Sequence, residues 1–398
     1  MMFICINFEH IPMASSVINH DLKENTLPSL VKGMELSDGI EFDVRMTSDE
    51  ELILHHDRRL SVSKNIKGDL PEYVEQNTLS DLKNMGFPSF NEIVKNSKIG
   101  DALRTQGKIM NIELKLPHPS SGSGGGWLSN RKNIPYIGKV LKQCSEILDE
   151  EEIPKHSVIF YGFFKHMNYA AKKINFDWKT SSLFPNQLRF GTEKMNRIYA
   201  APEFSLRSFK SMIKKQKKRG SPILPCALEY FMPPLNKLRL DRTYGLSGQP
   251  LERLLKVKKG FPIYIWPGLI KDELKLYEAG ISILTDNLNS NVYSLPEGIA
   301  RWTRPSTQPL NETWKNKFRS TDLENHHDLI KEAKREITPW HELNKNERKN
   351  FLEGWSKKWY WEKTSEIIEA STNNKLPWES VRIIGHRGCG NSPRPIFN

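Results

Sequence analysis

Two carboxylates stand two residues apart in the segment GIEFDV, residues 39–44. Successive side chains of a strand point to opposite faces, so Glu41 and Asp43 share one face if this segment is a strand. Carboxylates directed into one space repel each other unless a cation joins them, and oxygen ligands of this kind suit Mg²⁺ or Ca²⁺. The pair therefore indicates either a divalent-metal site or two solvated strand residues.

The segment NIELKL, residues 111–116, repeats this spacing with an acid and a base. Glu113 and Lys115 share one face of a strand by the same period of two. An acid beside a lysine can bind a metal and an anion together. An ordinary ion pair would show the same pattern.

Histidines follow two other apolar runs. The run ELILHHDRRL places His55 and His56 at the end of a short apolar strand, where they are either structural or a general acid or base. The turn GHRGCG places His386 and Arg387 between glycines, directly after the run VRII. The glycines allow the backbone to approach a ligand, and the forked donors of arginine suit phosphate oxygens.

The elements that must hold these residues alternate along the first 300 residues. Short β-like runs alternate with helical patterns, which is typical of βα units and a parallel sheet. The chain has 398 residues, and the number of units favours a closed barrel, which needs about 250. The clearest β-like runs span 39–44, 51–56, 108–116, 157–163, 261–266 and 281–286.

The remainder of the chain has a different character. Residues 301–375 hold six tryptophans, dense charge and amphipathic helical patterns, so we expect a helical appendage or linker packed onto a neighbour by its tryptophans. Residues 376–398 return to a strand and a loop. We therefore predict a barrel over 1–300 that lacks its usual first strand, an appendage over 301–375, and a final segment over 376–398 that completes the barrel.

Taken together, these segments resemble the glycerophosphodiester phosphodiesterase family. The motifs that carry the resemblance are HRG (386–388), ENT (24–26), IEFDV (40–44), a strand ending in HD (56–57) and IELK (112–115). The segments FPSFNEIV (87–94), IYIW (263–266) and ILTD (283–286) resemble further parts of the family. The resemblance covers about residues 20–116, 261–288 and 381–391.

The resemblance implies an α/β fold, the TIM (β/α)8 barrel, and metal-dependent hydrolysis of small glycerophosphodiesters to glycerol 3-phosphate and an alcohol. It implies one divalent cation, Mg²⁺ or Ca²⁺, as cofactor. The roles that it implies are metal ligands for Glu41, Asp43 and Glu113, an acid–base pair for His386 and His56, phosphate binding for Arg387 and Lys115, and a place in the substrate pocket for Trp266.

The order of the motifs departs from the family, in which HRG opens the barrel and ENT follows it. Here ENT lies near the beginning of the sequence and HRG near its end. A circularly permuted barrel, a slice of a tandem or longer protein, and a wrongly cut reading frame each explain this order. The permuted interpretation predicts that VRII inserts between the strand ending at Asp286 and the strand starting at Gly39.

The charge of the chain limits its partners. The net charge is +12, and residues 207–259 hold fourteen Lys and Arg against three acids. This excess suits an anionic membrane surface or a phosphate ester. Nucleic acid is not expected, because no aromatic interleaving or nucleic-acid module accompanies the charge.

The sequence also bears on the compartment. No apolar run approaches the ~20 residues of a membrane span, and the first residues lack the basic segment of a signal peptide. The four cysteines lie far apart with no CxxC pair, which favours neither zinc nor disulfides. We expect a cytoplasmic protein, and its oligomeric state stays open.

Two other functions fit the same residues. A lysophospholipase D-like or phospholipase C-like hydrolase on the same barrel would use the basic segment 207–259. A catalytically dead barrel acting as a binding protein would explain the detached position of His386. The intact carboxylates Glu41, Asp43 and Glu113 argue against the dead barrel.

Overall fold

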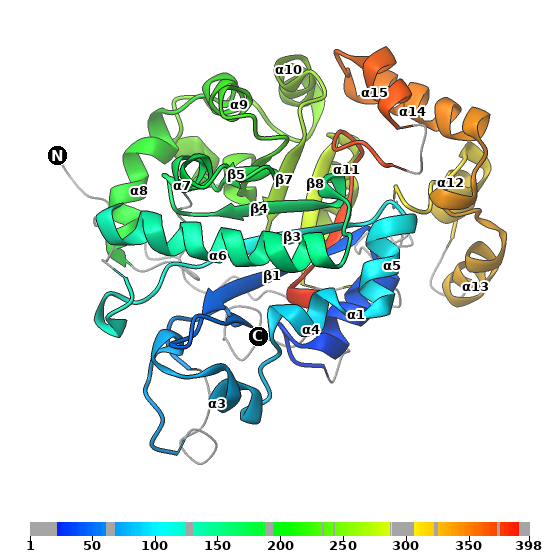
Figure 1. Ribbon diagram of the computed structural model, residues 1–398. Coiled ribbons are helices and arrows are strands. Elements are labelled where there is room, and N and C mark those ends of the chain that lie inside the picture. Colours follow the sequence, from blue (N-terminus) through cyan, green and yellow to red (C-terminus); the bar gives the residue numbers. More distant parts are fainter. Residues whose placement is uncertain are drawn as a thin grey trace.

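The computed structural model describes most of the chain (Figure 1). The described residues are 22–60, 68–124, 130–185, 187, 194–232, 235–241, 243–286, 288, 306–321, 325–371 and 375–389.

A parallel sheet forms the centre of the molecule. Its strand order is β5-β4-β3-β1-β9-β8-β7-β6, and β2 pairs with β1 off this path. Neighbours along the path run parallel, whereas β2 is antiparallel to β1. The strands are β1 (Gly39–Met46), β2 (Leu52–Leu54), β3 (Ile109–Leu114), β4 (Val158–Gly162), β5 (Thr180–Ser182), β6 (Leu224–Ala227), β7 (Ile263–Trp266), β8 (Ile281–Thr285) and β9 (Ile383–His386).

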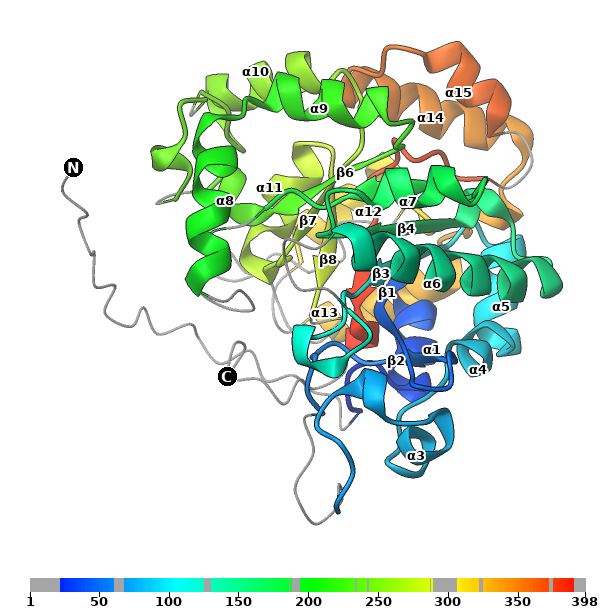
Figure 2. The ribbon, with the colours of Figure 1, turned by 60° about the vertical axis from the view of Figure 1, so that its left-hand side comes forward.

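The two ends of this sheet meet. The backbone N–H of Phe184, just past β5, donates to the carbonyl of Pro225 in β6 at 3.2 Å. The sheet therefore curls into a nearly closed barrel with helices outside it, which confirms the expected TIM-barrel architecture (Figure 2).

Strand β9 lies between β8 and β1. Ile383 pairs with Ile283 of β8, and Glu41 of β1 pairs with His386. All of β9 is buried, because both of its neighbours and the flanking layers cover it. A strand from late in the sequence thus separates the strand that ends at Thr285 from the strand that starts at Gly39.

The helices begin where short polar side chains can cap them. Thr26, Thr78 and Ser89 each accept a hydrogen bond from the third helical residue and complete a capping box. The helices are α1 (Leu27–Leu36), α3 (Leu79–Asn84), α4 (Phe90–Val94), α5 (Ser97–Thr105), α6 (Asn130–Glu150), α7 (Met167–Lys173), α8 (Lys194–Leu206), α9 (Phe209–Lys218), α10 (Gly248–Lys258), α11 (Glu273–Glu278), α12 (Glu312–Arg319), α13 (His326–Glu336), α14 (Lys345–Trp359) and α15 (Thr364–Ala370).

Apolar side chains fill both sides of the sheet. The larger clusters pack the helices onto the outside of the strands. A separate cluster fills the barrel interior, with Ile109, Ile159, Tyr264, Leu284 and Ile384 among its members. Each strand therefore has two buried faces, which is the reason that its sequence reads as a nearly continuous apolar run.

The helices α12 to α15 form the appendage, and they lie at the end of the barrel where the strands begin (Figure 1). Asp38, directly before β1, accepts hydrogen bonds from the backbone N–H and hydroxyl of Thr307 at 2.8 and 2.6 Å. Trp340, Trp355 and Trp359 stack in series and pack against Tyr277 of α11. These tryptophans have the packing role that the sequence favoured, whereas the domain boundaries at 300 and 375 stay predictions.

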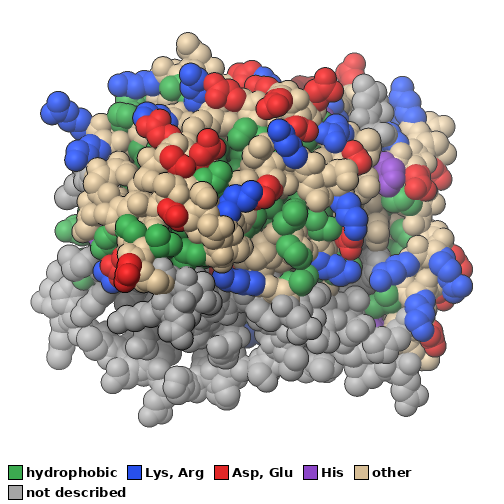
Figure 3. Space-filling model, turned by 60° about the horizontal axis from the view of Figure 1, so that its bottom comes forward, with side chains coloured by type: hydrophobic (Ala, Val, Ile, Leu, Met, Phe, Trp, Pro, Cys, Tyr) green, Lys and Arg blue, Asp and Glu red, His purple; other side chains and the backbone are tan. Residues whose placement is uncertain are grey.

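The basic excess of residues 207–259 is spread over several environments. Lys258 and Arg239 are buried, and Lys217 and Lys259 pair with Glu362 of the appendage at 3.6 and 2.6 Å. On the face seen in Figure 3, positive and negative side chains are interspersed. The excess positive charge of residues 207–259 therefore does not form one uniform surface patch, because some of these side chains are buried and others pair with an acid of the appendage. No helix among the described residues is long and apolar enough to span a membrane.

Candidate active site

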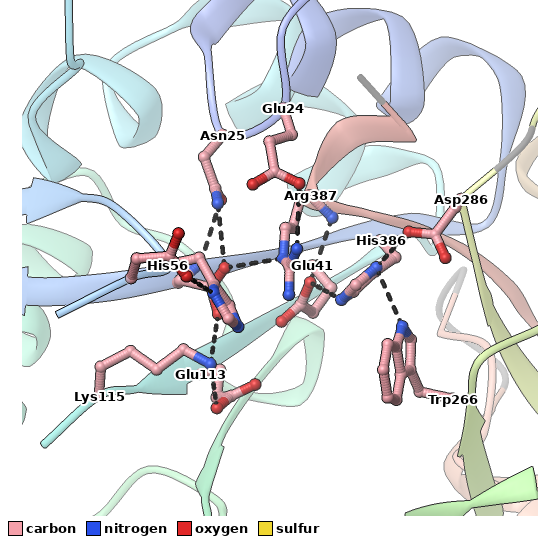
Figure 4. A network of polar contacts seen from close by, with 12 residues as sticks. Glu24, Asn25, Glu41, His56, Glu113, Lys115, Trp266, Asp286, His386 and Arg387 are labelled. Atoms are coloured by element: carbon pink, nitrogen blue, oxygen red, sulfur yellow. Dashed lines mark hydrogen bonds and ion pairs between the residues drawn. The ribbon is translucent and has the colours of Figure 1, made fainter. Parts of the chain in front are cut away.

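A network of polar side chains lies at the carboxyl ends of β1, β3 and β9 (Figure 4). In the sheet register Asp43 is level with Glu113, and Glu41 is level with His386. Because neighbouring parallel strands place level residues on the same face, all four side chains meet inside the mouth of the barrel. The active sites of TIM barrels lie at this end.

Three carboxylates form the centre of the network. Glu41 and Asp43 are fully buried and Glu113 is 8% exposed, and one oxygen of each lies within 4.8 Å of the others. Glu41 Oε1 is buried without a hydrogen-bond partner. Burial, together with the charges of Asp43 and Glu113, raises the pKa of Glu41 to about 7. An oxygen cluster with an unpartnered buried acceptor fits a hard divalent cation such as Mg²⁺ or Ca²⁺.

Two basic side chains neutralise Asp43. Lys115 Nζ lies 2.9 Å from Oδ1, and Arg387 Nε lies 3.0 Å from Oδ2. Lys115 also pairs with Glu113, and the side-chain amide of Asn25 donates to Asp43 Oδ2 at 3.0 Å. Burial alone would raise the pKa of Asp43, but the positive charges of Lys115 and Arg387 hold it well below its usual range. Asp43 is therefore ionised, with positive charge beside it.

Arg387 joins the final strand to the beginning of the described chain. Its backbone N–H donates to Glu41 Oε2 at 3.1 Å, and its guanidinium donates to Glu24 Oε2 at 3.0 Å. Its carbonyl accepts from the backbone N–H of Asn25 at 3.1 Å. The next residue, Gly388, has φ +71°, and a Cβ there would lie 2.5 Å from the backbone of Ser29. Only glycine allows this turn to pack against α1.

His386 is held from one side by a carboxylate. The Nδ1 atom of His386 lies 2.5 Å from Asp286 Oδ1 and 3.2 Å from the indole nitrogen of Trp266. These two contacts hold the Nδ1 edge of the ring, and Nε2 lies 3.7 Å from Glu41 Oε2. The ring therefore presents Nε2 to the centre of the network.

His56 lies on the other side of the carboxylates from His386 (Figure 4). Its Nδ1 lies 2.6 Å from Asp57 Oδ1. Burial and the charges of Arg387 and Lys115 lower the pKa of His56 to about 3, so the ring is neutral at physiological pH. Its neighbour His55 lies 3.0 Å from the Arg59 carbonyl and packs against Phe87, which is a structural position.

The structure brings together all eight residues singled out from the sequence, although their roles stay predictions. It adds Glu24, Asn25 and Asp286, each bonded to one of the eight. Glu24 and Asn25 belong to the ENT motif, and Asp286 ends the ILTD motif. Their positions, directly before a helix and directly after a strand, are the signals that could have identified them.

Comparison with known proteins gives one match by family model and several by structure. Residues 18–163 match the model described as the glycerophosphoryl diester phosphodiesterase family. No curated protein gives a significant match to the sequence.

Two solved structures illustrate the structural matches. The glycerophosphodiester phosphodiesterase of Thermotoga maritima is 19% identical, covers 66% of this chain and 88% of its own, and has a TM-score of 0.40. A phosphodiesterase of Oleispira antarctica was solved with the product sn-glycerol-3-phosphate. It is 15% identical, the match covers 67% of this chain and 89% of that chain, and the TM-score is 0.42.

The family match includes the segments that supply Glu24, Asn25, Glu41, Asp43, His56, Glu113 and Lys115. The similarity to the glycerophosphoryl diester phosphodiesterase family therefore extends over residues 18–163, which is less than half of the chain.

Proposed function

We propose that the protein hydrolyses glycerophosphodiesters to glycerol 3-phosphate and an alcohol, and that it needs one divalent cation. The observation that carries this proposal is the buried carboxylate cluster with the unpartnered Glu41 Oε1, set between two cationic side chains and two histidines. An anionic diester needs positive charge around its phosphate, and this site provides side chains for that purpose.

Glu41, Asp43 and Glu113 would hold the cation, either Mg²⁺ or Ca²⁺. When bound, the cation would supply positive charge that stabilises the additional negative charge of the transition state. Lys115 and Arg387 would bind the phosphate oxygens, since both cationic groups already converge on Asp43. Trp266 lies beside His386 and would form one wall for the glycerol or alcohol group.

The two histidines would divide the proton transfers. His56 is neutral and lies beside the carboxylates, so it would accept a proton from the attacking hydroxyl group. Asp286 holds the ring of His386 at Nδ1, so His386 would protonate the leaving alkoxide through Nε2. Their separation on opposite sides of the carboxylates matches attack and departure on opposite sides of a phosphate (Figure 4).

The test is release of glycerol 3-phosphate from glycerophosphocholine and glycerophosphoethanolamine with Mg²⁺, with Ca²⁺ and with EDTA. EDTA, Glu41→Gln and His386→Ala should each lower kcat at least about 100-fold, because metal and acid–base contributions are of that size. Glu50→Gln, an exposed carboxylate outside the network, should leave kcat unchanged. Full turnover in EDTA, or in Glu41→Gln, would overturn the proposal.

The proposal extends to the organisation of the chain. The family resemblance places HRG on the first barrel strand, whereas here HRG follows β9, which pairs with both β8 and β1. We interpret the chain as a permuted barrel in which residues 301–375 connect the strand that ends at Thr285 to β9. The pairing of β9 within its own chain supports this interpretation over a strand that belongs to another domain.

A further inference from the structure

Apolar side chains lie exposed on one edge of the molecule, on α8 and on the segment 238–240. Five of the eight large hydrophobic side chains that are exposed in the described chain belong to these two segments. We call them the rim surface: Ile198, Tyr199, Leu206, Leu238 and Leu240, which are 55%, 69%, 65%, 61% and 76% exposed. Exposed apolar residues scattered singly are ordinary, but a concentration of this kind marks an interaction site.

Helix α8 exposes apolar side chains on its outer face. Tyr199, Pro202 and Leu206 stand three and four residues apart, so they line one stripe of the helix, and all three are exposed. Phe204 points the other way and is fully buried. A helix on the surface of a water-soluble protein normally directs polar residues outward, so this stripe needs a partner.

The second segment is fixed against α8. The guanidinium of Arg239 donates to the carbonyls of Phe204 and Arg207 at 2.6 and 2.8 Å, and the N–H of Leu240 donates to the Ser205 carbonyl at 2.9 Å. Arg239 is buried at the end of a 3-10 turn, whereas its neighbours Leu238 and Leu240 are exposed. These bonds hold the apolar side chains in their exposed positions.

Basic side chains border the rim surface. Lys237 stands beside Leu238, Arg207 directly follows α8, and Lys210 is the second residue of α9, with Lys210 and Lys237 exposed. The nearby acids are engaged: Glu203 pairs with Arg207 and Lys215 at 2.8 and 3.0 Å, and Asp241 accepts from the backbone N–H of Phe209 at 2.8 Å. The border is therefore cationic, which complements an anionic surface.

The rim surface lies at the end of the barrel that carries the site. Helix α8 lies between β5 and α9 in the chain, and residues 238–240 follow β6, so both belong to connections from the carboxyl ends of strands. Figure 2 shows α8 at the outer edge of this end. Phe163, 50% exposed, directly follows β4 at the same end. The opposite end is covered by the appendage.

We propose that the rim surface docks the protein on an anionic phospholipid bilayer. The apolar side chains would enter the boundary between headgroups and acyl chains, and Arg207, Lys210 and Lys237 would contact the anionic headgroups. Docking of this kind would bring the candidate active site close to diesters derived from lipids. That consequence rests on the proposed function, whereas the docking itself does not. A second copy of this chain is the rival occupant, and the experiment below separates the two.

The test is flotation of the full chain with vesicles of pure phosphatidylcholine and with vesicles that contain one-quarter phosphatidylglycerol. We expect binding to the anionic vesicles and a fall of about tenfold in the partition coefficient for the triple variant Tyr199→Ser, Leu206→Ser, Leu240→Ser. Tyr360→Ser is the matched control, since Tyr360 is 51% exposed on the appendage. Hydrolysis of soluble glycerophosphocholine should be the same in all three proteins.

Each contrary outcome has a distinct meaning. Equal partitioning of the wild type and the triple variant, or no binding to either vesicle, would overturn the docking proposal. A loss of self-association in the triple variant, measured by light scattering without vesicles, would assign the rim surface to a second copy instead. Vesicle binding without turnover would leave the docking intact and contradict the proposed function alone.

Discussion

At the scale of single residues, Asp286 fixes how His386 can act. Its carboxylate lies 2.5 Å from Nδ1, so it orients the ring with Nε2 toward the carboxylates of the site. Asp286→Asn keeps the size of the side chain but loses the negative charge that holds the ring. We expect kcat to fall about 10- to 100-fold with little change in KM.

Asp272→Asn is the control for Asp286→Asn, since Asp272 is a buried carboxylate at the start of α11, outside the network. Steady-state kinetics and thermal unfolding of both variants separate a catalytic effect from a loss of stability. An unchanged kcat in Asp286→Asn would show that His386 does not depend on this carboxylate.

Lys258 makes stability depend on pH. It is 1% exposed and donates to the Gly280 carbonyl at 2.9 Å, and burial lowers its pKa to about 7 from 10.5. Between these two values the unfolded chain binds a proton that the folded chain does not, so the free energy of unfolding rises with pH by up to about 1.4 kcal/mol per unit. Below pH 7 both states carry the proton and this contribution is constant.

Urea denaturation at pH 7, 8 and 9 checks this expectation. Lys258→Met should lose the rise in the free energy of unfolding, whereas Lys256→Met, an exposed lysine of the same helix, should keep it. The same slope in Lys258→Met as in the wild type would show that Lys258 is not the group responsible.

The pairing of the candidate site residues on one face of a strand could be predicted from sequence because strand periodicity is local. The period of two places Glu41 with Asp43 and Glu113 with Lys115, without knowledge of the rest of the fold. The bond from Asp286 to His386 joins residues 100 positions apart, so no local rule contains it. For the same reason the sequence does not show that part of the positive charge of residues 207–259 is neutralised. Glu362, which pairs with Lys217 and Lys259, lies about 100 residues or more further along the chain.

At the scale of elements, the turn after β9 depends on the absence of a side chain at Gly388. Its φ is +71°, and a Cβ would lie 2.5 Å from Ser29 and 2.6 Å from Leu30, both backbone atoms of α1. Gly220 has the same φ, but a Cβ added there would meet no atom within 4 Å. An alanine at this position therefore measures the cost of the left-handed backbone conformation alone. Gly220→Ala should lower the free energy of unfolding by about 1 kcal/mol, and Gly388→Ala by a further 1–3 kcal/mol, approximately.

Chemical denaturation of the two glycine variants is the measurement. Equal losses would mean that α1 and the turn after β9 can separate without cost, which would contradict the close packing described here. Because Gly388 belongs to the HRG motif, the comparison uses stability and not activity.

Most strands were predictable, and the misses have physical reasons. The run 51–56 has the pattern of a barrel strand, but β2 pairs antiparallel with β1 outside the barrel path. Its position depends on a tight turn after Met46 that apolar periodicity does not encode. Strands β5 and β6 were not among the clearest runs, because β5 is the short polar segment TSS and β6 contains Pro225.

At the scale of the whole molecule, the tryptophan stack makes the appendage and the barrel one body. Trp359 is fully buried, and its ring meets Tyr277 of α11 at a centroid distance of 5.5 Å. Trp359→Ala should lower the free energy of unfolding of the whole chain by about 3–5 kcal/mol, because a large cavity opens between the two parts. Tyr360→Ala, the exposed neighbour, should change it much less.

Urea denaturation combined with limited proteolysis checks this expectation. A single transition at lower urea in Trp359→Ala would fit one cooperative unit. Release of an intact barrel, with cleavage confined to residues 306–371, would show instead that the appendage unfolds separately.

The place of β9 in the barrel has a consequence for synthesis on the ribosome. The hydrogen bond from the Arg387 backbone to Glu41 joins residues 346 positions apart, and His386 lies on β9, which follows the other described strands in the chain. A nascent chain that has not yet reached β9 lacks His386 and Arg387, and the place between β8 and β1 is still empty. On the proposed roles of these two residues, such a chain would not yet turn over its substrate.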